Sequence, residues 1–184
     1  LSLESSPLSG GSTEGNGLFY QGTSASISAT PDTGYSFSGW SGGGAVDPNA
    51  SSTTVDMSQA RSLSASFSLN SYDLTVLTGS GGSVTGSGSF SHGTNPSISA
   101  TPDTGYSFIG WSGEGTADPN ASSTTVDMSQ ARTLSASFSL NSYDLTVLAG
   151  SGGSVTGSGS FSHGSNPSIS ATPDTGYSFI GWSG

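Results

Sequence analysis

The stretch Leu134-Ser-Ala-Ser-Phe-Ser-Leu140 alternates apolar residues and serines without a break. This period of two is typical of a β-strand with one buried face and one solvated face. The same seven residues occur at Leu63–Leu69, 71 residues earlier (134 − 63). The strand therefore belongs to a repeated unit.

The 71-residue step extends over the whole chain, because Trp40, Trp111 and Trp182 follow one another at that spacing (111 − 40 and 182 − 111). Residues 143–184 repeat residues 72–113 with only two changes, at Ala149 and Ser165. We interpret residues 1–71 as a degenerate first repeat, 72–142 as a complete repeat, and 143–184 as a third, truncated repeat of a longer array. The alternative phase places the repeats at 43–113 and 114–184.

Further short strands are expected in each repeat. Alternating runs centre on Leu74, Ile98 and Val126, and weaker ones surround Val84 and Phe90. Turn residues separate them, and no window shows an apolar stripe with the 3.6-residue period of a helix. Each repeat is near the lower size limit for an independent core. The pattern predicts an all-β chain of tandem small antiparallel β-modules of about 71 residues each, arranged as an extended rod.

The connection between repeats has two interpretations. Only Asn141-Ser142 separates Leu140 from Tyr143, where the next strand begins. The pair is either a very short linker or a two-residue hairpin turn inside one repeat. We favour the linker, because serine resists the positive φ that such hairpin turns need. A linker this short would limit bending between repeats.

The stretch Gly105-Tyr-Ser-Phe-Ile-Gly-Trp-Ser-Gly113 recurs in every repeat, with Ser38 in place of Ile109 in the first. Ser-Ala-Thr-Pro precedes it each time, and Leu-Ser-Ala-Ser-Phe follows about 25 residues later in the first two repeats. With this order of motifs, the repeat resembles the divergent internalin B-repeat of bacterial surface proteins. The resemblance implies a small β-rich module, related to the β-grasp fold in some relatives, that serves as a stalk or spacer and has no catalytic residues. Many surface repeats are rich in lysine. This chain has none, which excludes isopeptide crosslinks from lysine to asparagine.

Composition excludes several classes of function. The net charge is −10, from 12 acidic residues against Arg61 and Arg132. Such a field repels nucleic acid and anionic membranes, which basic clusters bind. The chain has no cysteine, hence no disulfide or thiolate metal site. No signal peptide and no run of about 20 apolar residues is present, so we expect no membrane insertion in this segment. Its composition suits an extracellular or cell-surface protein of a bacterium.

The large aromatic residues are the expected core pins of each module. They are Trp40, Trp111, Trp182, Phe108 and Phe138. An exposed indole would instead offer a platform for stacking sugars, so glycan binding is the alternative interpretation. Because so few other large residues are available to build a core, we favour burial.

Polar candidates for chemistry are sparse. Calcium candidates are Asp103, Asp118 and Asp127, since carboxylate oxygens are the ligands that Ca²⁺ prefers. No known calcium loop is present, so solvated acids are the favoured interpretation and no cofactor is expected. His92 and His163 are expected to be solvated turn residues, because one histidine per repeat is too few for a metal site.

The two arginines are each expected to form a salt bridge with a nearby aspartate. Asn49 and Asn120 begin glycosylation sequons, most of which are unused in bacteria. Gln59 and Gln130 have the side chain needed for an ester crosslink to threonine, which intact mass would reveal through the loss of ammonia.

An active site needs a unique constellation of side chains, whereas every side chain in these repeats recurs. The chain is therefore not expected to be an enzyme. We expect a stalk or spacer of a secreted or surface-attached bacterial adhesin, or the body of an extracellular filament or biofilm component. Its partners would be neighbouring repeats and, in a filament, other copies by lateral or head-to-tail association. The alternative is a carbohydrate-binding accessory array on a secreted polysaccharide-degrading enzyme.

Overall fold

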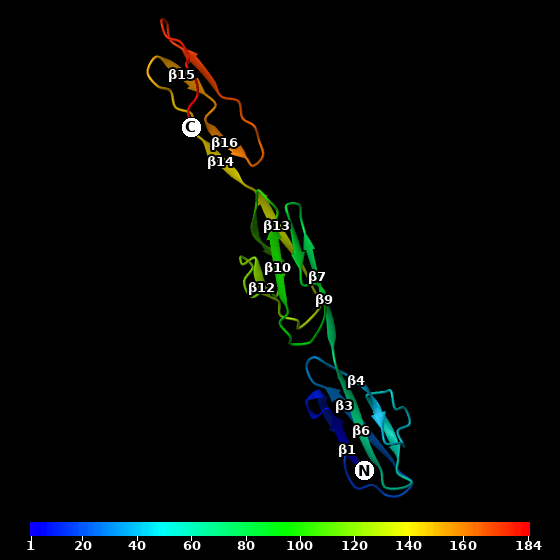
Figure 1. Cartoon of the computed structure of the whole chain (residues 1–184). Helices are drawn as coiled ribbons and strands as arrows, with labels where there is room; N and C mark the ends of the chain where they lie inside the picture. Colours follow the sequence, from blue (N-terminus) through cyan, green and yellow to red (C-terminus); the bar gives the residue numbers. More distant parts are fainter. The chain divides into compact units, whose positions relative to one another are not determined.

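The computed structural model describes all 184 residues and confirms an all-β chain (Figure 1). Strands up to residue 71 are β1 (Ser2–Ser6), β2 (Gly11–Glu14), β3 (Ser24–Pro31), β4 (Tyr35–Ser41), β5 (Ser52–Asp56) and β6 (Ser62–Leu69), with a 3-10 turn, η1, at Leu8–Gly10. The next are β7 (Ser71–Thr78), β8 (Gly82–Thr85), β9 (Gly88–Ser91), β10 (Ser97–Pro102), β11 (Tyr106–Ser112), β12 (Ser123–Thr125) and β13 (Arg132–Leu140). The last are β14 (Ser142–Leu145), β15 (Gly153–Thr156), β16 (Gly159–Ser162) and β17 (Ser170–Pro173).

The chain forms two compact units, and their boundary runs through the second repeat. The first unit combines 1–75 with 87–96 and 125–133. The second combines 76–86, 97–124 and 134–184. Because these units do not follow the sequence period, the repeat boundaries at residues 71 and 142 stay a prediction.

The first repeat consists of two three-stranded sheets that share one core. One sheet has the order β1-β6-β4 and the other β2-β3-β5. Alternate residues of β3 and β6 face inward, so that small and large apolar side chains interdigitate. The buried cluster contains Leu3, Ala25, Ile27, Ala29, Trp40, Val55, Met57, Leu63, Ala65 and Phe67. The outward positions of β6 are serines, which explains the alternation in its sequence.

One pairing differs from the predicted antiparallel modules. β1 pairs with β6 in parallel, with Leu3 opposite Leu63. Parallel neighbours need a long crossover connection, and these two strands are the first and last of the repeat. Alternation in the sequence indicates which face of a strand is buried but not the direction of its neighbour. The other pairs in this repeat, such as β4 with β6, are antiparallel.

The later repeats use the same elements. The sheet β12-β10-β8 corresponds to β5-β3-β2, and the sheet β11-β13-β7-β9 includes the counterparts of β4, β6 and β1. Residues 143–184 form two antiparallel pairs, β14 with β16 and β15 with β17. The strand expected around Val126 is shorter than predicted, because β12 ends at Thr125.

Candidate functional site

A single residue, Asn70, connects the last strand of the first repeat to β7. β6 ends at Leu69 and β7 begins at Ser71. β6 pairs with β1 and β4, whereas β7 pairs with β9 in another sheet. The two strands do not form a hairpin with each other. Asn70 is therefore a linker, and we name the surroundings of this residue and of its counterpart Asn141 the repeat junctions.

Both backbone groups of Asn70 are bonded, and their partners lie on opposite sides of the junction. Its N–H donates to the carbonyl oxygen of Gly34 in the first repeat, at 2.7 Å. Its carbonyl oxygen accepts from the N–H of His92, beyond β9, at 2.8 Å. These bonds extend the β4–β6 and β7–β9 ladders to the linker itself. The backbone is thus held on both sides at the one residue where the chain passes between repeats.

The side chain of Asn70 adds a third bond. Its Oδ1 accepts from the Ser36 hydroxyl at 2.6 Å. Each neutral hydrogen bond contributes about 1 kcal/mol net. Because three such bonds converge on one residue, its dihedral angles have little freedom.

His92 packs against the backbone of the preceding repeat at Gly34. An ideal Cβ built on Gly34 would overlap the imidazole at Cδ2, so only glycine admits the ring. Gly34 also has a φ of 84°, in the left-handed region that favours glycine. The Tyr72 ring meets the imidazole edge-on, with centroids 6.0 Å apart. His92 is half-buried, and its Nδ1 is buried without a hydrogen-bond partner.

The interpretation as a solvated turn residue was therefore wrong for His92, whereas His163 is exposed in its turn, as predicted. The His92 ring fills the space above a glycine that lies 58 residues earlier (92 − 34), a contact that local sequence does not reveal. The equivalent position in the first repeat holds Gln21 (92 − 71), so histidine is not a general requirement of this turn.

The second junction reproduces the first. Asn141 N–H donates to Gly105 O at 2.7 Å, and His163 N–H donates to Asn141 O at 2.7 Å. Ser107 donates to Asn141 Oδ1 at 2.6 Å, the same length as in the first junction. Gly105 again has a φ of 84°, and a Cβ there would overlap the His163 ring. The same contacts therefore recur after one 71-residue step.

Trp40 and Trp111 are buried, with 7% and 6% of their surfaces exposed. Their indole N–H groups donate to Ala50 O at 3.1 Å and Ala121 O at 2.9 Å, which ties the following loop to the strand. Neither ring presents a face on which a sugar could stack. Trp182 differs from its predicted role as a core pin and is 45% exposed. Residues 143–184 contain no counterpart of the strands β6 and β13 that cover the other two indoles.

The predicted aromatic pins of the second repeat contact one another. Phe108 lies between Trp111 and Phe138, with ring centroids 5.6 and 5.9 Å apart. Both phenylalanines are half-buried. Tilted and edge-on pairs of this kind add about 0.5–1.5 kcal/mol each beyond the burial of their surface.

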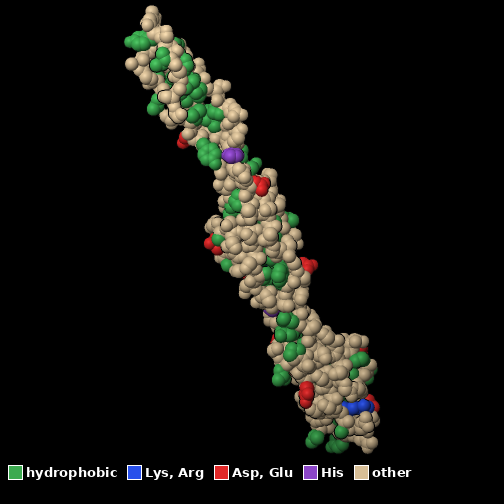
Figure 2. All heavy atoms as spheres, viewed as in Figure 1, with side chains coloured by type: hydrophobic (Ala, Val, Ile, Leu, Met, Phe, Trp, Pro, Cys, Tyr) green, Lys and Arg blue, Asp and Glu red, His purple; other side chains and the backbone are tan.

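The predicted calcium ligands do not meet. No group of three or more His, Cys, Asp or Glu side chains is placed to hold a metal ion. Figure 2 shows the carboxylates as isolated spots on the visible face. Asp103 is exposed, and Asp118 Oδ1 accepts from the backbone of Asn120 at 2.9 Å, which closes a turn. The third candidate, Asp127, forms an ion pair.

The predicted salt bridges are confirmed. Arg61 lies 3.7 Å from Asp56 and Arg132 lies 3.2 Å from Asp127, and both arginines also donate through Nε to the backbone oxygen of the same aspartate. The Ser129 hydroxyl, together with the Arg132 guanidinium, holds the pKa of Asp127 below its ordinary value. These contacts close the turn before β6 and β13 and contribute little to stability, because the carboxylates are exposed.

The sequence model of the divergent InlB B-repeat domain matches the chain three times, at residues 1–71, 72–142 and 143–184. No curated protein and no solved structure matches the chain. Domains of this family are not typically catalytic. The structure contains no helix with the length and hydropathy needed to span a membrane.

Proposed function

The chain belongs to the divergent InlB B-repeat family, and we propose that it is a stalk or spacer segment of a large secreted or surface-attached bacterial protein. Tandem repeats of this type indicate a bacterial surface repeat region. Within such a region, we propose the specific role of a spacer that sets the distance between an anchor and a binding domain. Its site of action would be outside the cell or on its surface.

The observation that carries this proposal is the repeated junction. A spacer needs the geometry of one module to be transmitted to the next. A single linking residue with both backbone groups bonded limits rotation, whereas a flexible linker of several residues would let the ends approach. Gly34 and His92 add a steric contact that a bent junction would lose. The contacts recur at Asn141, so each added repeat would be joined in the same way.

The side chains at the surface support a passive role. Outward positions of β6 and β13 are serine and threonine, and the acidic groups are spread out. The net charge of −10 adds electrostatic repulsion between such surfaces. The buried indoles of Trp40 and Trp111 speak against the alternative of carbohydrate binding.

The length contributed by one repeat follows from its central strand. β6 has eight residues, and with Asn70 it covers about 30 Å at roughly 3.3 Å per residue. β1 runs parallel to β6 and pairs with its residues Ser62–Ser66, so the first and last strands of the repeat run in the same direction along the module. Each repeat of a stalk would then add about 30 Å.

Small-angle X-ray scattering tests the proposal on the 184-residue chain and on chains with one and two further copies of residues 72–142. The maximum dimension is expected to rise linearly, by about 30 Å per copy. Two glycines inserted after Asn70 and Asn141 provide the control, because they keep each module and free the junction. An increase no steeper than that of the control chains would refute the stalk. A concentration series of the same samples tests association into filaments, which we propose as a further use of this array.

A further inference from the structure

The first and last strands of the first repeat lie side by side and run in the same direction (Figure 1). β1 pairs with β6 from Ser2 opposite Ser62 to Ser6 opposite Ser66. The Ser2 N–H also donates to the carbonyl oxygen of Arg61 at 3.0 Å. We name the backbone bonds between these two strands the parallel ladder. In the second repeat, β13 likewise lies beside the first strand, β7.

One face of the parallel ladder is shielded from water. Leu3 and Leu63 lie opposite each other and are both buried in the core of the repeat, as is Ala65, opposite Ser5. Water reaches the ladder from the other face, where the side chains are serines and Glu4. A shift of β1 along β6 would therefore break backbone bonds and withdraw Leu3 from the core at the same time.

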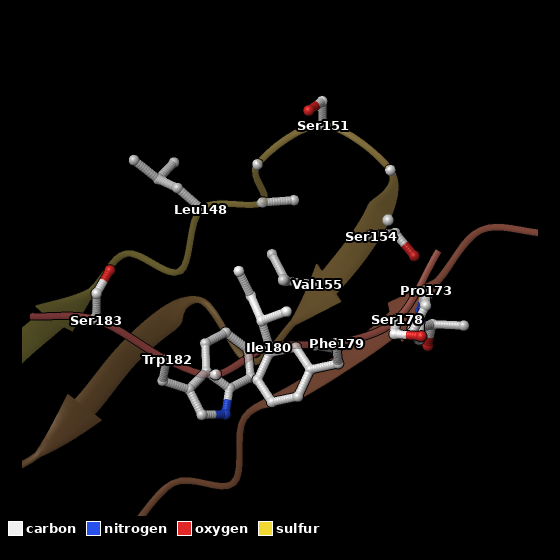
Figure 3. A pocket seen from close by; sticks show the side chains of 17 residues that line it. Leu148, Ser151, Ser154, Val155, Pro173, Ser178, Phe179, Ile180, Trp182 and Ser183 are labelled. Atoms are coloured by element: carbon white, nitrogen blue, oxygen red, sulfur yellow. The ribbon is translucent and has the colours of Figure 1, made fainter. Parts of the chain in front are cut away.

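β6 is anchored on its other edge by β4. The two strands pair antiparallel, and the Phe67 ring of β6 meets Phe37 of β4 edge-on, with centroids 6.0 Å apart. Phe37 also packs against Trp40, at 5.7 Å. The counterparts Phe179 and Trp182 lie beside each other as well, 5.2 Å apart, although no strand corresponds to β6 there (Figure 3). The aromatic pair thus forms within its own segment and offers β6 a ready surface.

The direction of β1 and β6 decides how a pull on the chain acts on the repeat. In a tandem array, tension enters a repeat at its first strand and leaves it after its last. Because β1 and β6 are parallel, this tension draws β1 toward its N-terminal end and β6 toward its C-terminal end. The strands must slide along each other, so every bond of the parallel ladder carries load at the same moment. A pull on the same end of both strands would break the bonds one after another.

We propose that the parallel ladder is a mechanical clamp, which lets a repeat bear tension as well as set a distance. A single backbone hydrogen bond contributes little in water, so the strength of the clamp comes from several bonds that share the load. Forced unfolding is governed by the barrier to unfolding rather than by equilibrium stability. The proposal rests on the proposed stalk, because a stalk transmits the pull between its two ends.

Single-molecule force spectroscopy on the 184-residue chain tests the clamp. The chain has no cysteine, so a pair of introduced cysteines defines where the force acts. Ser2→Cys with Ser71→Cys loads the parallel ladder along its strands. Ser2→Cys with Gln59→Cys is the matched control, because residue 59 comes just before Ser62, the partner of Ser2, and the pull opens the ladder from that end. All three substituted positions are exposed.

Both pairs enclose only residues of the first repeat. The chain between them has 69 residues (71 − 2) or 57 residues (59 − 2), which span about 240 and 200 Å when fully extended and so identify the unfolding event. At equal loading rate, the pair at 2 and 71 is expected to unfold at a force at least twice that of the control pair, because the ladder bonds share the load. A ratio below two would overturn the clamp.

Two proline variants identify the ladder as the cause. Successive N–H groups of a strand point to opposite edges, and here the Ser2 N–H points to β6 whereas the Leu3 N–H donates to Asn16 Oδ1. The Glu4 N–H therefore points to β6 and the Ser5 N–H points away. Glu4→Pro removes a donor from the ladder and should lower the unfolding force of the pair at 2 and 71 to about half. Ser5→Pro imposes the same ring, leaves the ladder donors in place and should keep the force.

Equal forces for the two proline variants would also overturn the clamp. The comparison of the two pulling directions uses neither proline, so it decides the question even where Glu4→Pro does not fold. The clamp and the stalk fail separately, because scattering measures length without load. Linear growth with a force ratio below two would leave a stalk without a clamp. Growth no steeper than that of the glycine controls, with a ratio of two or more, would refute the stalk while the ladder still resists force.

Discussion

Replacing Gly34 with alanine is expected to loosen the first junction. The residue has a φ of 84°, and an alanine in the left-handed region costs about 1–2 kcal/mol. The new Cβ would also overlap the imidazole of His92. Overpacking of this kind costs typically about 1–3 kcal/mol. The change should therefore destabilise the junction by about 2–5 kcal/mol in total.

Amide hydrogen exchange reports this loss at the junction itself. The N–H groups of Asn70 and His92 donate the two backbone hydrogen bonds that hold Asn70 on either side of the junction. The steric part, about 1–3 kcal/mol, corresponds to exchange that is about 5- to 150-fold faster through local opening. Amides in the core, such as that of Ala29, should keep their protection because the modules stay folded.

Two controls separate the clash from backbone strain. Gly22→Ala has a similar φ of 82° with nothing within 4 Å of the added Cβ, and should leave the junction amides unchanged. In a His92→Ala background, Gly34→Ala should lose its steric part, which gives a coupling of about 1–3 kcal/mol in a double-mutant cycle. Additive effects of the two changes would refute the reasoning. His92→Ala alone should be nearly neutral, because it removes an unpaired buried Nδ1 as well as the contact with Tyr72.

Three further predictions concern the tryptophans, metal binding and the ion pair of Asp127. Trp111→Ala should destabilise the chain by about 3–5 kcal/mol in urea unfolding, whereas Trp182→Ala should have a much smaller effect, because its indole is 45% exposed. A chelator is expected to leave the thermal midpoint unchanged, since no three potential metal ligands converge. The lowered pKa of Asp127 favours the charged form in the folded chain, so its small contribution is present above the ordinary aspartate pKa and is lost as pH falls through the lowered value. Carboxyl NMR titration checks this, and an Asp127 midpoint at or above the ordinary aspartate pKa would contradict it.

The strands with strong alternation could be predicted from the sequence. Leu134, Ala136 and Phe138 all lie on one face of β13, as the pattern requires, and Leu134 and Ala136 are fully buried. The alternation of residues such as Leu74 and Val76 has the same cause. These features are local, because a strand of period two displays its buried face in its own sequence.

The junction could not be predicted in the same way. Gly34 and His92 lie in different repeats, and each looks like an ordinary turn residue in its own surroundings. One difference between the repeats was visible in the sequence, however. The histidine at 92 and 163 is replaced by Gln21 in the first repeat, whereas the glycine recurs in all three. The parallel pairing of β1 with β6 could not be predicted either, because alternation in a sequence does not indicate the direction of the neighbouring strand.

The most direct test of the central claim, that the junction holds neighbouring repeats in one geometry, is a distance measurement between spin labels. The chain has no cysteine, so Ser26→Cys on β3 and Ser89→Cys on β9 would give two unique attachment points, both exposed. Pulsed electron resonance should show one narrow distance distribution. The same labels in a chain with two glycines inserted after Asn70 should give a broad one. Equal widths in the two chains would contradict a fixed junction.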